Sequence, residues 1–155
     1  MAQRQYVGID LHRRRSVIVR MDAAGTVVGE ARIDNDPKAL AAEIARAGEA
    51  PEVVLEATYG WYWAVDVLEA LGCRVHLAHP LGIKAFELRR LKNDRLDARL
   101  LADLLRMGRL PEAWIAPRPV RELRELVRYR HKLVDDRSGL KAQVSTPCWP
   151  RGECE

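Results

Sequence analysis

Residues 6–33 read YVGIDLHRRRSVIVRMDAAGTVVGEARI, three short strand-like runs joined by two turns. The first run, 6–10, is apolar and ends in an acid, and the second, 16–21, is β-branched and alternates apolar with polar side chains. A glycine in the turn before the third run, 26–33, is typical of a hairpin. The sequence therefore predicts that the chain opens with a three-stranded meander.

Strands and helices alternate after this meander. A cap residue followed by Pro37 predicts a helix that runs to about residue 47. Residues 52–56 read as a buried strand that ends in an acid, 58–71 as a helix, and 74–78 as a fifth strand. This order predicts an α/β fold with a mixed five-stranded sheet, part of it parallel, and flanking helices.

The pattern becomes helical after residue 82. Residues 94–107 place leucines at helical spacing, and a proline-bearing connector covers 110–119. Residues 120–144 are predicted to form one long C-terminal helix with a narrow apolar seam that two arginines interrupt. The seam packs either against a helix of a second copy, which makes a homo-oligomer, or back on the chain's own sheet.

Size and composition restrict the class of protein. The chain has 155 residues, of which 48% are hydrophobic and 31% charged, as in one ordinary globular domain. No run approaches the ~20 apolar residues of a membrane span, and the amino terminus lacks the apolar region of a signal peptide. Three cysteines are too few for a disulfide framework. We therefore expect a cytoplasmic protein with no membrane partner.

The basic charge is concentrated in the second half of the chain. Residues 1–83 hold 9 Lys and Arg against 11 Asp and Glu, whereas residues 84–155 hold 17 against 11. Clustered arginine attracts polyphosphates, because a guanidinium pairs bidentately with phosphate oxygens. This distribution indicates nucleic-acid binding; the alternative is a solvated helix face balanced by its own acids.

Four carboxylates form the candidate site. Asp10 and Glu56 each end a predicted buried strand, and sites in open α/β sheets lie outside the carboxyl ends of the strands. Asp94 and Asp97 are three residues apart at a helix start, so they share a face. Converging carboxylates repel unless a cation neutralises them, and oxygen ligands suit Mg²⁺ or Mn²⁺. Taken singly, Asp94 also reads as a helix cap and Glu56 as an ordinary strand-end acid.

Three motifs carry a family resemblance. Residues 8–12 (GIDLH), 55–61 (LEATYGW) and 92–98 (KNDRLDA) resemble the DEDD transposases, insertion-sequence enzymes related to the Piv DNA invertase. The match covers about residues 5–144. The resemblance implies a RuvC-like domain of the ribonuclease H fold, in which the same four carboxylates are the catalytic, metal-binding tetrad.

The resemblance also implies a function. DEDD transposases cleave and exchange DNA strands by phosphoryl transfer that depends on Mg²⁺ or Mn²⁺, guided by a structured RNA from the element, so we expect a bacterial protein at the nucleoid. Basic neighbours of such a site hold the phosphodiester backbone, and the candidates are Arg13, Arg14, Lys92, Arg95 and Arg99. His12 follows Asp10 by two residues, and we favour a surface role for it over one in the site.

Two alternatives and one departure from the family remain. The chain is alternatively a fragment of an actin-like or sugar-kinase-like ATPase, or a non-catalytic nucleic-acid-binding module. DEDD transposases also carry a serine-bearing C-terminal domain that is absent from this sequence, so we expect a truncated form, inactive alone.

We divide the chain into a catalytic domain (1–110), a connector with the long helix (111–144) and an aberrant tail (145–155). One permitted codon spelling of that tail, shifted in frame, continues the helix, which favours a frameshift.

Overall fold

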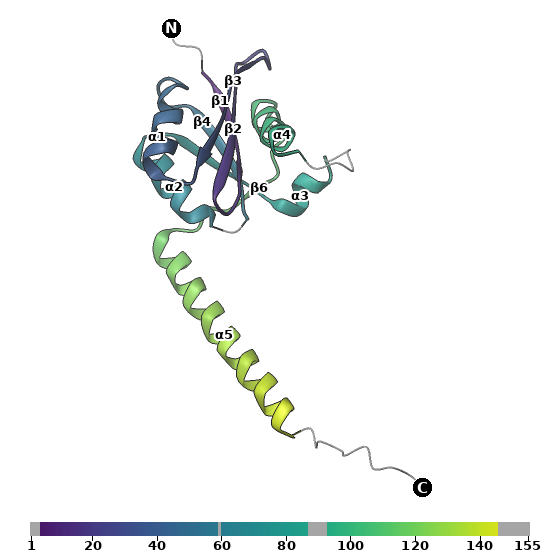
Figure 1. The fold of residues 1–155 in the computed structure, drawn as a ribbon. Helices are drawn as coiled ribbons and strands as arrows, with labels where there is room; N and C mark the ends of the chain where they lie inside the picture. The colour runs from purple at the N-terminus through teal and green to yellow at the C-terminus, as the bar shows by residue number, and fades with distance from the viewer. Residues whose placement is uncertain (1–3, 59, 87–92, 146–155) are drawn as a thin grey trace. The chain divides into compact units, whose positions relative to one another are not determined.

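The computed structural model describes residues 4–58, 60–86 and 93–145. The chain divides into two compact units, with the boundary between Ile115 and Ala116. The first unit is built on a mixed sheet with the strand order β3-β2-β1-β4-β5-β6 (Figure 1). The strands are β1 (Tyr6–Leu11), β2 (Arg15–Met21), β3 (Val27–Asp34), β4 (Glu52–Glu56), β5 (Arg74–Ala78) and β6 (Glu112–Ala113). The helices are α1 (Pro37–Ala45), α2 (Trp61–Ala70), α3 (Pro80–Lys84), α4 (Asp94–Arg106) and, in the second unit, α5 (Arg118–Ser145).

The predicted meander is confirmed as β1, β2 and β3. β1 and β2 pair antiparallel with Asp10 opposite Val17, and β2 and β3 pair antiparallel with Val17 opposite Arg32. The turn between β2 and β3 is held by Asp22, whose carboxylate accepts hydrogen bonds from two backbone N–H groups of the turn at 2.9 and 2.8 Å. Because paired residues point to the same side of a sheet, Asp10, Val17 and Arg32 form a row across three strands on one face.

The parallel part of the sheet is also confirmed. β4 pairs parallel with β1, with Ile9 beside Leu55, and β5 pairs parallel with β4. α1 begins where the sequence indicates, because Asp36 accepts a hydrogen bond from a backbone N–H of the first turn at 2.9 Å and Pro37 is its first residue. β1 therefore lies between β2 and β4, and a ladder of backbone hydrogen bonds holds each of its edges.

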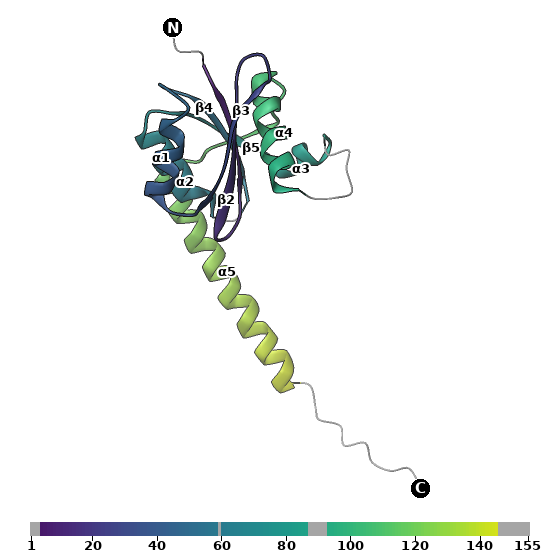
Figure 2. The ribbon, with the colours of Figure 1, turned by 45° about the horizontal axis from the view of Figure 1, so that its top comes forward.

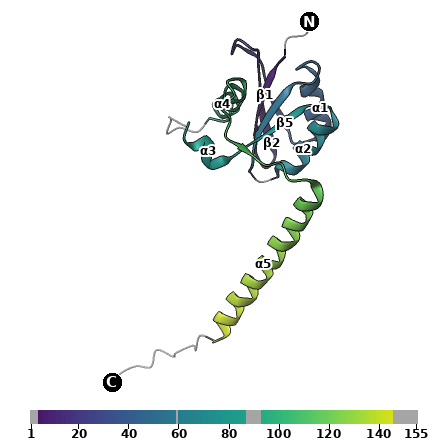
Figure 3. The same cartoon turned by 180° about the vertical axis from the view of Figure 1, so that it is seen from behind.

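The helices of the first unit cover opposite faces of the sheet. Figures 2 and 3 show α1 and α2 on one side of the strands and α4 on the other. The side chains of β1 and β4 alternate accordingly: Ile9 and Leu55 belong to the core shared with α1 and α2, whereas Val54 packs with the leucines of α4. The central strands β1 and β4 are thus buried on both faces, and the candidate acids lie beside α4, at the carboxyl ends of these strands and on the first turn of the helix.

The structure adds a sixth strand to the five predicted ones. β6 lies in the connector and pairs antiparallel with β5, with Leu77 beside Ala113. A strand of two residues is too short to show a periodic pattern in the sequence. β6 forms because the edge of β5 offers backbone groups that need hydrogen-bond partners. α2 begins at Trp61 rather than at residue 58, because Gly60 adopts a φ of 81° just before it.

The long C-terminal helix is confirmed as the 28-residue α5. Most side chains of its apolar seam are more than half exposed in the structure, including Leu123, Leu126, Leu133 and Leu140, whereas Val134 is partly buried. The predicted aberrant tail falls on residues that, after Ser145, lie outside the described part of the chain. The division near residue 110 stays a prediction. Within the described residues, none of the helices is long and apolar enough to cross a membrane.

Candidate metal centre

Asp10 and Glu56 lie on neighbouring parallel strands at one edge of the sheet. Ile9 pairs with Leu55, so the next residues, Asp10 and Glu56, follow side by side on strands about 4.8 Å apart. Both alternate with residues that pack toward α1 and α2, and so both point to the α4 face. The predicted adjacency of these two strands is confirmed.

α4 contributes Asp94 and Asp97, both in its first turn, where the helix dipole favours negative charge. The residue that caps this helix is Asn93, whose Oδ1 accepts a hydrogen bond from the backbone N–H of Arg95 at 3.1 Å. The alternative interpretation of Asp94 as the cap is therefore wrong. Because Asn93 satisfies the helix end, the carboxylate of Asp94 is available to other side chains.

Gly8 determines how closely α4 approaches β1. A Cβ at this position would collide with the carbonyl oxygen of Ala98 and lie 2.8 Å from the backbone nitrogen of Ala102. The backbones of helix and strand therefore touch. This contact brings the first turn of α4 to the end of β1 that carries Asp10.

His12 joins the two groups of acids. Its Nε2 lies 2.9 Å from Oδ2 of Asp10 and 3.3 Å from Oδ1 of Asp94. The hairpin turn holds it there, because its backbone N–H donates to the carbonyl of Arg15 at 3.0 Å and its own carbonyl accepts from Asn35 at 2.6 Å. The predicted surface role of His12 therefore describes only part of its position. The imidazole is 43% exposed, but it also contacts Asp10 and Asp94.

Arg32 is a site residue that the sequence analysis missed. Its Nη2 lies 3.1 Å from Oδ2 of Asp94, so both oxygens of that carboxylate have a basic neighbour. Arg32 comes from β3, in the same row across the sheet as Asp10. The signal was present in the meander, since pairing its three strands in register places Arg32 on the face of Asp10.

The surroundings of Asp10 disfavour the ionised form of its carboxyl group. Burial raises the pKa of Asp10 above its ordinary value, and the carboxylates of Asp97 and Asp94 raise it further, whereas His12 lowers it. Nε2 of His12 lies 2.9 Å from the Oδ2 of Asp10, and the pKa of Asp10 stays raised despite this contact.

These residues fit a divalent cation. Asp10, His12 and Asp94 each offer one ligand atom, and the three atoms lie within 4.8 Å of one another. Carboxylate oxygens are the ligands that Mg²⁺ and Mn²⁺ prefer, and a cation would offset both the burial of the Asp10 carboxylate and the repulsion among the acids. Glu56 reaches the same edge through the strand register, and Asp97 acts on Asp10 through its charge.

Four of the five basic candidates lie in the described part of the chain. Arg13 and Arg14 are exposed in the hairpin turn that follows Asp10, and Arg99 is exposed on α4. The guanidinium of Arg95 lies 3.6 Å from the carboxylate of Glu30 on β3. Lys92 lies outside the described residues.

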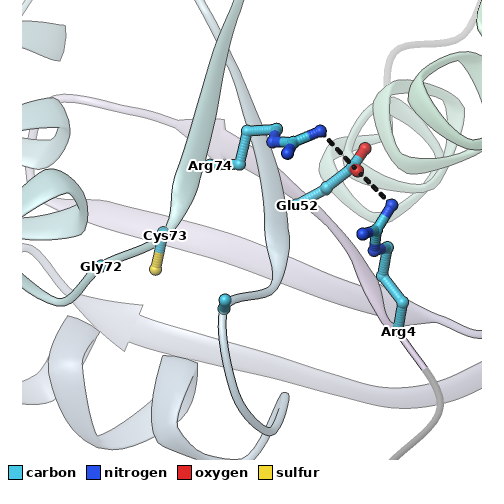
Figure 4. A pocket seen from close by; sticks show the side chains of 6 residues that line it. Arg4, Glu52, Gly72, Cys73 and Arg74 are labelled. Carbon is cyan, nitrogen blue, oxygen red and sulfur yellow. Dashed lines mark hydrogen bonds and ion pairs between the residues drawn. The ribbon is translucent and has the colours of Figure 1, made fainter.

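The opposite edge of the sheet shows a contrasting arrangement. Glu52, the first residue of β4, lies 3.1 Å from Arg4 and 3.6 Å from Arg74 (Figure 4). These residues border a cavity of about 370 Å³ that Cys73 also lines. Two guanidinium groups already neutralise Glu52, so an acid at this edge has no comparable need for a metal ion.

Comparison with known families decides the ancestry. The IS110-type DEDD transposase family, described as transposase, matches residues 7–146. The chain belongs to this DEDD transposase family. The family that the three motifs indicated is thereby confirmed, and the match covers residues 7–146 of the 155 in this chain. Members of this family use divalent metal ions. No curated protein matches the chain significantly.

Solved structures show the fold of this DEDD transposase chain. RuvC from T. thermophilus, in complex with a Holliday junction substrate, matches with a TM-score of 0.50 and 13% identity, over 71% of this chain and 99% of RuvC. The large terminase nuclease of the thermophilic phage G20c matches with a TM-score of 0.45 and 14% identity, over 64% of this chain and 81% of the nuclease. The likeness to RuvC confirms the ribonuclease H-like fold that the resemblance implied.

Proposed function

We propose that this chain carries the divalent-metal site of a DNA transposase and serves phosphoryl transfer in transposition and recombination. Asp10, Glu56, Asp94 and Asp97 are the metal ligands, and the ion is Mg²⁺ or Mn²⁺. One observation carries the proposal: ligand atoms of Asp10, His12 and Asp94 lie within 4.8 Å of one another, and the carboxylates of Asp97 and Asp94 add to the raised pKa of Asp10.

The protein's part in this chemistry is to hold the acids at a fixed spacing. The β1–β4 ladder sets the distance between Asp10 and Glu56, and one helical turn sets that between Asp94 and Asp97. Divalent ions bound by such carboxylates supply the charge that activates an attacking oxygen and stabilises a leaving oxygen. The contact of α4 with β1 supports the convergence of the two pairs.

We assign nucleic-acid binding to the basic side chains near the site. Arg13 and Arg14 are exposed in the turn after β1, Arg95 and Arg99 are exposed on α4, and Lys92 precedes α4 in the sequence. Their ligands are the DNA strands and a structured RNA encoded by the element, which associates the protein with the bacterial nucleoid. The similar RuvC structure contains a Holliday junction substrate, and this supports DNA as the ligand.

We further propose that α5 joins two copies of the chain. The leucines Leu126, Leu133 and Leu140 recur every seven residues and are exposed, which suits packing against another helix. Replacing Leu126 and Leu133 together by Glu should convert an oligomer to a monomer in light-scattering measurements. A wild-type chain that is monomeric at the same concentration would contradict the pairing.

A metal titration tests the main proposal. Mn²⁺ binding is measured by calorimetry on the wild-type chain, on Asp10→Asn, and on Asp34→Asn as control. Asp34 is a suitable control because its carboxylate is 83% exposed, pairs with Arg15 at 3.3 Å, and is not among the side chains whose ligand atoms converge with that of Asp10. The proposal predicts that Asp10→Asn weakens Mn²⁺ binding at least tenfold, whereas Asp34→Asn leaves it unchanged. Equal affinity in all three proteins, or no binding by the wild type, would refute the metal site.

A further inference from the structure

A groove borders the acidic centre, between β3 and the first turn of α4. Its volume is about 520 Å³, and Val17 of β2 lines it together with residues of both walls. The wall from β3 carries Glu30 and Arg32, and the wall from α4 carries Asp94 and Arg95. The groove therefore opens beside a carboxylate of the proposed metal site and is lined by two arginines.

Two ion pairs cross this groove. Arg32 of β3 lies 3.1 Å from Asp94 of α4, and Arg95 of α4 lies 3.6 Å from Glu30 of β3. Both arginine side chains are largely exposed, at 62% and 73%. Exposed pairs of this kind contribute little net stability, because water competes for both partners. Each guanidinium can therefore leave its carboxylate for a better ligand at little cost.

The carboxylate of Asp94 cannot contact His12, Arg32 and a divalent cation at the same time. Its Oδ2 lies 3.1 Å from Arg32 and its Oδ1 lies 3.3 Å from His12. A divalent cation at this carboxylate takes oxygens that these two groups approach, so Arg32 and the cation compete for Asp94. A cation that binds there leaves the guanidinium of Arg32 beside both the groove and the site.

A guanidinium in this position suits one class of ligand. Its planar fork of N–H donors matches two oxygens of a phosphate group, and such bidentate pairs are stronger than neutral hydrogen bonds. Each wall of the groove carries one arginine beside one carboxylate, and the two arginines are the groups that can pair with phosphate. A phosphodiester held at the metal site continues along a backbone of further phosphates. Arg32 also lies in the row of residues that leads across the sheet to Asp10.

We propose that the groove between β3 and α4 binds the phosphodiester backbone of the strand at the acidic centre, and that Arg32 exchanges Asp94 for a phosphate when the divalent ion binds. This inference rests on the proposed function, because it needs a metal at Asp94. Arg95, on the facing wall, contacts the same backbone. Arg32 is thus a counter-ion of the acids in the metal-free protein and a substrate-binding residue in the loaded one.

A purely structural role for Arg32 makes a different prediction. If the pair with Asp94 only fastened α4 to β3, its loss would lower thermal stability and weaken metal and nucleic-acid binding together. The exchange instead predicts effects of opposite sign: removal of Arg32 frees Asp94 for the cation and removes one phosphate contact.

The experiment compares Arg32→Gln with Arg4→Gln in the full chain. Arg4 is a close match, since it is 59% exposed and lies 3.1 Å from Glu52 at the opposite edge of the sheet (Figure 4). Mn²⁺ affinity is measured without nucleic acid. Affinities for a DNA and an RNA oligonucleotide of the same sequence are then measured with Mn²⁺ at several salt concentrations.

Arg32→Gln should tighten Mn²⁺ binding about two- to fivefold, the equivalent of a lost exposed ion pair. It should weaken oligonucleotide binding and reduce the salt slope by roughly 0.7–0.9, the value of one phosphate contact. Arg4→Gln should change none of these. Whichever oligonucleotide responds, DNA or RNA, is the strand in the groove.

Two results would overturn the exchange. One is an unchanged affinity and salt slope for both oligonucleotides; the other is weaker Mn²⁺ binding accompanied by a lower unfolding temperature. Arg32→Lys provides a second test in case the Gln variant misfolds, because lysine keeps the positive charge but cannot donate two parallel hydrogen bonds to one phosphate. This variant should retain the wild-type salt slope and still bind the oligonucleotide more weakly. A wild-type chain that binds no Mn²⁺ refutes the proposed function itself, which separates that failure from a failure of Arg32.

Discussion

Gly8→Ala tests whether the packing of α4 on β1 sets the geometry of the metal site. The added Cβ would collide with the carbonyl oxygen of Ala98 and lie 2.8 Å from the backbone nitrogen of Ala102. Neither atom belongs to a side chain that can rotate away, so the whole helix must shift. Restoring only the second contact to an ordinary 3.4 Å requires a displacement of at least 0.6 Å.

This displacement has two measurable consequences. Overpacking against backbone costs about 1–3 kcal/mol in the free energy of unfolding, which lowers the Tm of a chain of this size by roughly 2–12 °C. Asp94 and Asp97 move with α4 while Asp10 stays on β1. Because metal–ligand distances tolerate only about 0.2 Å, Mn²⁺ affinity should fall about tenfold or more.

The assay combines thermal unfolding with a Mn²⁺ titration, and Gly139→Ala is the control. Gly139 lies in α5, and a Cβ there meets no atom of the described residues within 4 Å. This control should keep the wild-type Mn²⁺ affinity and gain up to about 1 kcal/mol from helix propensity. A Gly8→Ala protein with wild-type Tm and affinity would refute the close approach. A lower Tm at unchanged affinity would refute the link between packing and site.

Two further predictions concern buried carboxyl groups. Asp10→Asn should raise the free energy of unfolding of the metal-free protein at neutral pH, because burial and the neighbouring carboxylates raise the pKa of Asp10 in the folded state. The advantage should shrink as the pH falls through that raised pKa, where the wild-type carboxyl takes up a proton; a difference that stays constant between pH 3 and pH 7 would contradict this cause. Glu43→Ala should cost roughly 3 kcal/mol in chemical denaturation, because Glu43 is 6% exposed and pairs with Arg20 at 3.2 Å and Arg46 at 3.0 Å. A loss well below 1 kcal/mol would mean that water already solvates Arg20 in place of the lost carboxylate.

Features with a local cause were predictable from the sequence. The turn between β2 and β3 has Asp22 to accept its backbone N–H groups, and α1 has Asp36 and Pro37 at its start. The meander and the long helix follow from the periodicity of their side chains in the same way. β6 was not predictable, because its two residues have no pattern and their pairing depends on the exposed edge of β5.

The candidate site also has a part that was predictable from the sequence and a part that was not. The motifs around Asp10, Glu56 and Asp94 indicate the family without any structure, and the family match over residues 7–146 confirms the family. The surroundings of the acids were misjudged: Asn93, not Asp94, caps α4, and His12 contacts two of the acids. A cap depends on which backbone N–H a side chain reaches, and two neighbouring residues of capping type are hard to rank from sequence.

The sequence by itself determined most of the helices and strands and which acids stand at their ends, because periodicity, caps and turn residues act within a few positions of the chain. Only the tertiary structure decided which basic groups meet those acids. Arg32 reaches Asp94, 62 residues away, because hairpin register places it in the row of Asp10 and because Gly8 lets α4 touch β1. Contacts of this kind depend on strand register and helix approach together, and both are set by packing over the whole sheet rather than by neighbours in the chain.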